Sequence, residues 1–318
     1  MPPESTTPRI SIIIPNWNGL GLLRPCLDAL RRQTYTDHEV IVVDNASSDG
    51  SLAALRDEYP EVRVVALPTN RGFAGGCNEG IRAARGEFIV ATNNDTEAEP
   101  GWLAALVDAL DRHPEAGSAA ARIMLHGRRD TLHSAGDIFR RDGTPDSRGV
   151  WQPYGPPFDR ECHVFGGCGG ATMYRRAMLE QIGAFEESFF MYCEDVDLNW
   201  RAQLAGWKCV YVPEAVIYHH LSATGGGPLS SFHVGRNTLW VLARNYPADL
   251  WRRHWREIVR GQWRIARDAL RAWRGAAARA RLRGQIAGLV GLWRWRRARR
   301  SIQAGRRVTD AYLESILD

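Results

Sequence analysis

The chain has 318 residues, 44% of them hydrophobic, which is enough for one large domain or one domain with an appendage and excludes a disordered protein. The net charge of +5 is unevenly divided: residues 1–250 carry 23 Lys+Arg against 31 Asp+Glu, whereas residues 251–318 carry 18 Arg against 5 Asp+Glu. The basic tail is therefore expected to have its own task and an anionic partner.

The chain begins with "MPPESTTPRI", which lacks the basic-then-apolar pattern of a signal peptide. Residues 1–8 are expected to be disordered. Later apolar stretches such as "IAGLVGLW" are far shorter than a membrane span, and the six scattered cysteines form no CxxC pair. We expect a cytoplasmic protein with reduced thiols.

Short runs rich in Val and Ile alternate with segments of helical spacing in the first half. The runs predict strands buried on both faces at 9–15, 39–44, 62–67 and 87–92. The helical segments are 20–33, 51–59, 74–84 and 102–110. This alternation predicts an α/β fold with a parallel sheet and right-handed crossovers.

Each predicted strand ends in polar residues, namely "PNWNG", "DNASSDGS", "PTNRGFAGGCNEG" and "NNDT". Asp44 and Asn45 could accept a hydrogen bond from a base or a ribose, Arg71 could offset phosphate charge, and the glycines after the third strand permit close backbone approach. Each signal alone is more typical of turns and helix caps. Their coincidence at one sheet edge favours a nucleotide site, and "GFAGGC" lacks the G-x-G-x-x-G spacing of a dinucleotide enzyme.

The fourth predicted strand ends on Asn93, Asn94 and Asp95. Asp95 could belong to a turn that caps the following helix, because Asp and Asn accept hydrogen bonds from nearby backbone amides. The alternative is a carboxylate at the carboxyl edge of the sheet, where it would hold a metal beside a phosphate.

After a stretch at 125–162 that we predict to be irregular, Glu194, Asp195 and Asp197 stand at the start of a helix ended by Gly206, before a strand at 208–212. An acidic first turn is favoured by the helix dipole. A carboxylate beneath a cleft can also be the general base for an attacking hydroxyl group.

Two adjacent histidines, His219 and His220, follow another apolar run. Neighbouring residues of a strand face opposite ways, so one histidine is expected to reach the cleft and the other to be packed or solvated. A neutral imidazole there could complete a carboxylate metal site.

Taken together, these segments resemble the family 2 inverting glycosyltransferases and, within them, the rhamnosyltransferase-like branch. The matching pieces, in the order of the family, are "SIIIPNWNG", "VIVVDNASSDGS", "NRGFAGGCNEGI", "FIVATNND", "GAFEESFFMYCEDVDLNWRAQLAGWK" and "YHHLSATGG". The resemblance covers about 9–245. It implies a GT-A fold with a mostly parallel, Rossmann-like sheet, a nucleotide diphosphate-sugar donor, and a divalent cation, Mg²⁺ or Mn²⁺.

Residue roles follow from the resemblance by position. It implies donor contacts at Pro15, Asn18, Asp44, Asn70, Arg71 and Asn94. It implies that Asp95 is the main metal ligand, with Asn93 in place of an acid of the common D-x-D motif. The spacing H-x-x-S-x-T marks His219, with Ser222 and Thr224, as the histidine on the metal side.

In "CEDVDL", the resemblance makes Asp195 the catalytic base and Glu194 an acid that orients the acceptor. The motif Q-x-x-R-W of processive synthases is absent from the sequence, which favours a single addition. The implied division is a catalytic domain at 9–245, with a nucleotide-sugar half at 9–112 and an acceptor half at 113–245, followed by a basic helical tail at 246–318.

The tail combines arginine with an apolar stripe at helical spacing, and it holds 6 of the 12 tryptophans beside its 18 arginines. The stripe could pack on the catalytic domain or a second subunit. The composition favours an anionic membrane surface, here the inner face of a bacterial plasma membrane. Nucleic acid is a weaker candidate, because no zinc finger or RNA-recognition signature accompanies the arginines.

The sequence thus predicts a metal-dependent inverting glycosyltransferase that moves a sugar, with L-rhamnose one candidate, to a saccharide or a polyprenyl-linked glycan. Two other readings stay open. The chain could bind a nucleotide sugar without turnover, although "CEDVDL" is intact, or its tail could make it a nucleic-acid-associated module.

Overall fold

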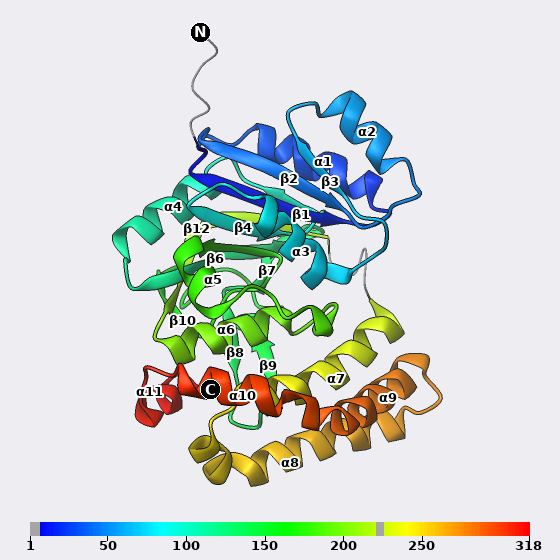
Figure 1. Cartoon of the computed structure of the whole chain (residues 1–318), viewed down its shortest axis with the longest axis vertical. Coiled ribbons are helices and arrows are strands. Elements are labelled where there is room, and N and C mark those ends of the chain that lie inside the picture. The colour runs from blue at the N-terminus through cyan, green and yellow to red at the C-terminus, as the bar shows by residue number, and fades with distance from the viewer. Residues whose placement is uncertain (1–6, 221–225) are drawn as a thin grey trace.

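The computed structural model describes residues 7–220 and 226–318, so most of the predicted disordered segment 1–8, together with Ser222 and Thr224, lies outside the described residues. A ten-stranded sheet forms the centre of the molecule, with its main path in the order β10-β12-β6-β11-β4-β1-β2-β3. Figure 1 shows helices on both sides of this sheet and a further group of helices below it. The α/β class is confirmed.

The first half follows the predicted alternation. Its strands are β1 (Ile10–Asn16), β2 (His38–Asp44), β3 (Arg63–Ala66) and β4 (Phe88–Thr92), and its helices are α1 (Leu20–Arg31), α2 (Ser51–Glu58), α3 (Gly72–Ala83) and α4 (Trp102–Arg112). Neighbouring strands here pair in parallel. Their carboxyl ends, and the polar residues that follow them, therefore meet at one edge of the sheet.

Strand β3 differs from the prediction that it is buried on both faces. It is the last strand on its side of the sheet and pairs with β2. Its side chains are largely exposed, with Val64 at 37%. The Val-rich composition predicted the strand correctly, but it could not distinguish an edge strand from a central strand of the sheet.

The second half adds strands of both directions. They are β5 (Thr96–Ala98), β6 (Ala116–Leu125), β7 (Arg128–Ser134), β8 (Asp137–Phe139), β9 (Pro145–Ser147), β10 (Cys162–Val164), β11 (Ala171–Arg175) and β12 (Lys208–His219). Strand β11 lies antiparallel between β4 and β6 and joins the two halves into one sheet. The helices are α5 (Arg176–Ile182), α6 (Glu194–Ala205) and a 3-10 turn at Glu187–Phe189.

The prediction of an irregular stretch at 125–162 was wrong, because β7, β8 and β9 lie within it. Strand β7 has the sequence RRDTLHS and is exposed in its first three residues. Such a strand carries little apolar patterning, and its pairing with β6 determines its conformation more than its own composition does.

Two apolar clusters fill the two faces of the sheet. Successive isoleucines of β1 alternate between them, since Ile12 belongs to one cluster and Ile13 to the other. The first cluster includes side chains of α1 and α4, and the second includes side chains of α3, α5 and α6. These layers hold the carboxyl edge of the sheet in place.

The C-terminal helices are α7 (Gly227–Asn245), α8 (Ala248–Arg271), α9 (Ala276–Val290), α10 (Arg296–Ala304) and α11 (Asp310–Ser315), with a 3-10 turn at Leu292–Trp295. Ile258, Trp295 and Leu317 of this region share a buried cluster with Phe139 and Trp200. The tail is helical, and its apolar side chains on the inner side pack against the preceding part of the chain. The division at residue 245 stays a prediction.

Candidate active site

A cavity of about 550 Å³ opens where the parallel strands end. Its wall combines the ends of β1, β2 and β4, the start of α3, the loop before α6 and the start of α7. Among the described residues that line it are Pro15, Trp17, Asn45, Asn70, Gly72, Asn94, Asp95, His133, Gly169, Tyr192, Glu194, Asp195, His219 and Ser230. Seven of the ten predicted site residues are among them: Pro15, Asn70, Asn94, Asp95, Glu194, Asp195 and His219.

Asp95 and His219 face each other across this cavity wall. Asp95 is 2% exposed, and its Oδ1 lies 3.1 Å from Nε2 of His219. Among the described residues, this oxygen has no partner in hydrogen-bond geometry. A buried carboxylate oxygen without a donor, beside an imidazole nitrogen, is a donor set that fits a divalent cation.

His133 is a third member of this group, and sequence reasoning missed it. Its Nδ1 lies 3.0 Å from Nδ1 of His219, so one ring must donate a hydrogen bond to the other. Burial, and then the charge of His219, lowers the pKa of His133 to about 4, which favours its neutral form at physiological pH. His133 lies on β7, in the stretch that composition predicted to be irregular.

The neighbouring His220 has a different environment. Its Nε2 lies 3.1 Å from Oε1 of Glu97, and its ring stacks on His126 with the ring centres 3.6 Å apart. Of the two adjacent histidines, the structure brings His219 to the cavity, as alternation along β12 requires.

Asp195 and Glu194 begin α6 on another part of the cavity wall. Asp195 accepts hydrogen bonds of 2.8 Å from the backbone amides of Gly169 and Val196. Burial nevertheless raises the pKa of Asp195. Burial, and then the charge of Asp195, raises the pKa of Glu194 well above its usual range. Two carboxyl groups that both favour protonation are suited to proton transfer.

We expect Glu194→Gln to stabilise the folded protein at neutral pH. The pKa of Glu194 is raised on folding, so the stability that this residue contributes is present below the ordinary glutamate pKa and is lost as pH rises through the folded-state pKa. Glutamine does not ionise, so the variant does not lose stability as pH rises. Thermal unfolding at pH 7 should therefore shift upward by about 2 °C or more, and the difference should vanish near pH 4.

The control for this measurement is Glu180→Gln on the exposed side of α5, which should change the midpoint little. A Glu194→Gln protein that unfolds at the same temperature as the unaltered protein at pH 7 would contradict the expected destabilisation by this carboxylate.

Asp197 has a structural environment although it shares the acidic first turn. It is fully buried, and its oxygens lie 2.8 Å from Nε of Arg201 and 2.9 Å from Nε of Arg244. It also accepts a hydrogen bond of 2.7 Å from Asn245. The carboxylate of Asp197 on α6 thus binds Arg244 and Asn245 of α7, and these contacts connect the two helices.

The loop that leads into α6 has an unusual backbone. Phe190, Tyr192 and Cys193 have φ angles of 67°, 65° and 65°, which non-glycine residues rarely adopt. The buried amide of Asn237 on α7 donates to the carbonyls of Phe189 and Tyr192 at 3.0 and 2.7 Å. These bonds hold the loop, and with it the start of α6, against the cavity.

The predicted donor residues fall into two groups. Pro15, Asn70 and Asn94 line the cavity. Asn18 and Asp44 do not line it: Oδ1 of Asn18 accepts from the amide of Ser48 at 2.7 Å, and Oδ2 of the fully buried Asp44 accepts from the amide of Ser47 at 3.0 Å. Oδ1 of Asp44 has no hydrogen-bond partner among the described residues, and the donor roles of both residues stay predictions. These bonds shape the loop after β2.

Arg71 also points to other partners. It forms ion pairs with Glu79 and, at 2.5 Å, with Glu187. It therefore connects α3 to the turn at Glu187–Phe189, while the adjacent Asn70 lines the cavity and accepts from the amide of Gly72 at 2.8 Å.

Two further wall residues are Trp17, which the sequence analysis did not identify, and Asn45, which it named with Asp44 as a possible hydrogen-bond acceptor. Trp17, in the turn after β1, is 48% exposed and lines the cavity, as does Asn45 after β2. A tryptophan inside the polar turn "PNWNG" was the available signal, since a large exposed apolar side chain in such a turn is unusual. At Gly76, a Cβ would lie 2.8 Å from Nδ2 of Asn45 and 3.1 Å from Cβ of Pro15, so glycine is what lets α3 pack against this wall.

Comparison with known proteins gives consistent matches. The sequence model described as "Glycosyl transferase family 2" matches residues 11–183. An N-acetylglucosaminyl-diphospho-decaprenol L-rhamnosyltransferase of Mycobacterium tuberculosis is 30% identical over 262 residues, covering 74% of this chain and 84% of that protein. An O-antigen biosynthesis protein of Myxococcus xanthus is 30% identical over 236 residues, covering 70% of this chain and 18% of that protein.

Solved structures with low sequence identity share the fold. GalNAc-T7 with UDP, GalNAc and Mn²⁺ has a TM-score of 0.61 at 15% identity, covering 76% of this chain and 48% of that chain, so this chain spans about half of its length. A mannosyltransferase of Pyrobaculum calidifontis in complex with GDP-Man and Mn²⁺ has a TM-score of 0.56 at 18% identity, covering 95% of this chain and 85% of that chain. The expected GT-A type of fold is confirmed.

Proposed function

Because this chain belongs to glycosyl transferase family 2, and is therefore a glycosyltransferase, we propose that it moves a sugar from a nucleoside diphosphate-sugar to a hydroxyl group of a lipid-linked glycan with inversion. The observation that carries the proposal is one cavity whose wall holds both the Asp95–His219 group and the Glu194–Asp195 pair. The name of the mycobacterial relative supports L-rhamnose as the sugar and a diphospho-polyprenol as the carrier of the acceptor.

Asp195 is the proposed general base. As the acceptor oxygen bonds to the anomeric carbon, its proton passes to the carboxylate of Asp195, and the bond from that carbon to the nucleoside diphosphate breaks. A single displacement inverts the configuration. The raised pKa of Asp195 makes it a better proton acceptor than an ordinary aspartate, and the amides of Gly169 and Val196 fix its orientation.

Asp95 and His219 are the proposed ligands of a divalent cation, Mg²⁺ or Mn²⁺. The unpartnered Oδ1 of Asp95 supports this assignment. When bound, such a cation neutralises charge that develops on the departing diphosphate. Pro15, Asn70 and Asn94 then form the wall next to the donor, and Asn94 is oriented by a hydrogen bond of 2.7 Å to Oδ1 of Asn16.

His133→Ala is expected to weaken Mn²⁺ binding by about 10-fold or more, because the partner of a metal-ligating histidine fixes its tautomer and ring orientation. If His133 accepts from Nδ1 of His219, the lone pair of Nε2 is left on the side of Asp95. The measurement is a Mn²⁺ titration followed by electron paramagnetic resonance.

Two variants make that titration specific. His133→Asn keeps an acceptor and should restore part of the affinity, and His38→Ala, whose ring contacts the carbonyl of Tyr35 and does not line the cavity, should leave it unchanged. Equal Mn²⁺ affinity in His133→Ala and the unaltered protein would remove His133 from this role.

The test of the proposed function is a screen of nucleotide sugars for thermal stabilisation with Mg²⁺ or Mn²⁺, followed by turnover of those that bind. Oligonucleotide binding at physiological salt is measured in parallel. Binding without turnover would favour a nucleotide-sugar-binding protein, and oligonucleotide binding alone would favour a nucleic-acid module.

We also propose that the tail attaches the enzyme to the anionic inner face of a bacterial plasma membrane. Within residues 7–220 and 226–318, no helix is long and apolar enough to span a bilayer. Trp255, Trp273 and Trp293 are exposed on the tail. In the same described ranges, none of the arginines at 279, 281, 283, 294, 296, 297, 299 and 300 lies within 4.0 Å of a carboxylate oxygen. Unpaired arginine beside exposed tryptophan suits an anionic interface.

A variant with Trp255, Trp273 and Trp293 each replaced by serine should lose most of its binding to vesicles of phosphatidylglycerol and phosphatidylcholine. Deleting residues 251–318 is a poor alternative, because it would remove Ile258 and Trp295 from the buried cluster. Sedimentation at low and high salt is the measurement, and high salt should release the unaltered protein in part. Equal sedimentation of variant and unaltered protein would contradict the proposal.

A further inference from the structure

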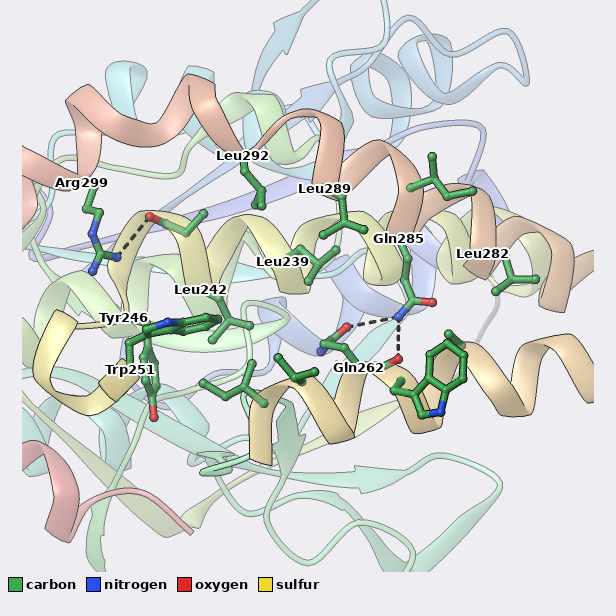
Figure 2. A pocket seen from close by; sticks show the side chains of 16 residues that line it. Leu239, Leu242, Tyr246, Trp251, Gln262, Leu282, Gln285, Leu289, Leu292 and Arg299 are labelled. Carbon is green, nitrogen blue, oxygen red and sulfur yellow. Dashed lines mark hydrogen bonds between the residues drawn. The ribbon is translucent and has the colours of Figure 1, made fainter. Parts of the chain in front are cut away.

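A second cavity, of about 700 Å³, lies between α7, α8 and α9, away from the candidate active site. Figure 2 shows Leu239, Leu289 and Leu292 around this space, with Tyr246 and Trp251 at one end. Some polar groups on its wall have partners within the protein: Nε2 of Gln285 donates to the backbone and side-chain oxygens of Gln262, both at 3.2 Å, and Arg299 donates to the carbonyl of Ala243 at 3.3 Å. Nε2 of Gln262, Oε1 of Gln285 and the hydroxyl of Tyr246 are buried without a hydrogen-bond partner among the described residues. The remainder of the wall is apolar.

The apolar wall of this groove is not covered by the rest of the described chain. Trp263 is 64% exposed, Ile286 62% and Leu289 58%. Soluble proteins rarely leave so many large apolar side chains together at the surface unless they contact a partner. A groove of this volume and character matches the size of a small-ligand site rather than of a flat protein interface.

We infer that this groove holds the hydrocarbon chain of the lipid-linked acceptor, an inference that rests on the proposed function. The charge around it identifies the occupant. Arg299 lines the groove, and residues 251–318, which form most of it, carry 18 Arg against 5 Asp+Glu, so an apolar chain with an anionic head is complementary both to the apolar wall and to the charge of this region. A second copy of this chain would instead bring another strongly basic tail against the first.

Helix α7 connects the groove to the candidate active site. Ser230 and Val234 of its first half line the active-site cavity, and Leu239 and Leu242 of its second half line the groove. At 1.5 Å per residue, Val234 and Leu239 are separated by about 8 Å along the helix axis. A lipid held in the groove is therefore kept close to the site where its glycan must react, which raises the effective concentration of the acceptor.

The probe for this site is farnesyl phosphate, a soluble isoprenoid with an anionic head. Ala266→Trp fills the groove and should weaken its binding by about 10-fold or more, since the apolar wall would no longer be accessible. Val290→Trp places the same side chain on an exposed position of α9 outside the groove wall and should bind as the unaltered protein does. Calorimetric titration measures both, with inorganic phosphate as the ligand control.

A second variant covers the case that Ala266→Trp does not fold. Ile286→Asp changes a side chain that is already 62% exposed and places a carboxylate on the groove wall, so it should also weaken binding. Equal farnesyl phosphate affinity in either folded groove variant and in Val290→Trp would overturn the inference, as would tight binding of inorganic phosphate alone. Donor turnover is measured separately, so failure of the lipid site and failure of the proposed transferase activity are distinguishable.

Discussion

Replacing Asp195 by asparagine is expected to lower the turnover number by about 100-fold or more while donor affinity stays near that of the unaltered protein. The amide has nearly the shape of the carboxylate, and its oxygen can still accept a backbone hydrogen bond where Gly169 or Val196 now donates to Asp195. It cannot take a proton from the acceptor. Single-turnover transfer and donor binding by calorimetry separate the two effects.

The pH dependence of the unaltered enzyme gives an independent measurement of the same role. A general base works when deprotonated, so the rate should fall as pH falls through the pKa of Asp195, and burial raises that pKa. The acid limb of the profile should therefore lie above the ordinary aspartate range. Near-normal turnover in Asp195→Asn would reassign the base to Glu194, because Asp197 is held by Arg201 and Arg244.

The sequence predicted the parallel half of the sheet well because its strands and helices carry strong local patterns. The predicted starts and ends of β1, β2, β4, α1 and α4 lie within two residues of those in the structure. In this half each strand is apolar and is followed directly by its polar turn. Asn94 and Asp95 could therefore be identified from their position after a strand, whereas Asn70 was identified through the resemblance to the family.

His133 could not be found in this way. It is brought to His219 by the pairing of β7 with β6, next to which β12 lies in parallel. The segment around it, RRDTLHS, has no apolar run, so no local pattern predicted a strand. A residue whose position depends on long-range pairing leaves no signal in a single sequence.

The roles of Asp44 and Arg71 show a second limit. Both stand at strand ends where a nucleotide contact is plausible, and the resemblance assigns both to the donor. In the structure Asp44 binds the amide of Ser47 and Arg71 pairs with Glu187. Sequence position could not give these contacts, and the donor roles of Asp44, whose Oδ1 has no hydrogen-bond partner among the described residues, and of Arg71 stay predictions.

The tail shows how one amphipathic pattern can serve two surfaces. The sequence left open whether the tryptophan stripe packs on protein or faces a membrane. In α8, Leu250, Ile258 and Ala269 are buried, whereas Trp255 and Trp263 are exposed. One helix thus has an inner apolar face and an outer one, and a helical projection of the sequence does not separate them.

Asp95→Ala is expected to abolish metal-dependent transfer and donor hydrolysis without unfolding the protein. Oδ1 of Asp95 has no hydrogen-bond partner within the described part of the chain, so removing it breaks no hydrogen bond at that atom and relieves a buried carboxylate. The thermal midpoint without metal should stay close to that of the unaltered protein or rise.

The matched control is Glu97→Gln, two residues along the chain on β5, where the carboxylate pairs with His126 and His220. It should retain near-normal transfer, because the side chains of His126 and His220 contact Glu97, and none of these three residues is among those that line the cavity. Transfer is measured at saturating donor across a Mn²⁺ titration, with and without chelator. The unaltered protein and Glu97→Gln should lose activity with chelator and regain it with Mn²⁺, and Asp95→Ala should stay inactive throughout. If Asp95→Ala transfers sugar at the normal rate in both conditions, the strand-end carboxylate is not a metal ligand, and its place at the end of β4 reflects turn formation alone.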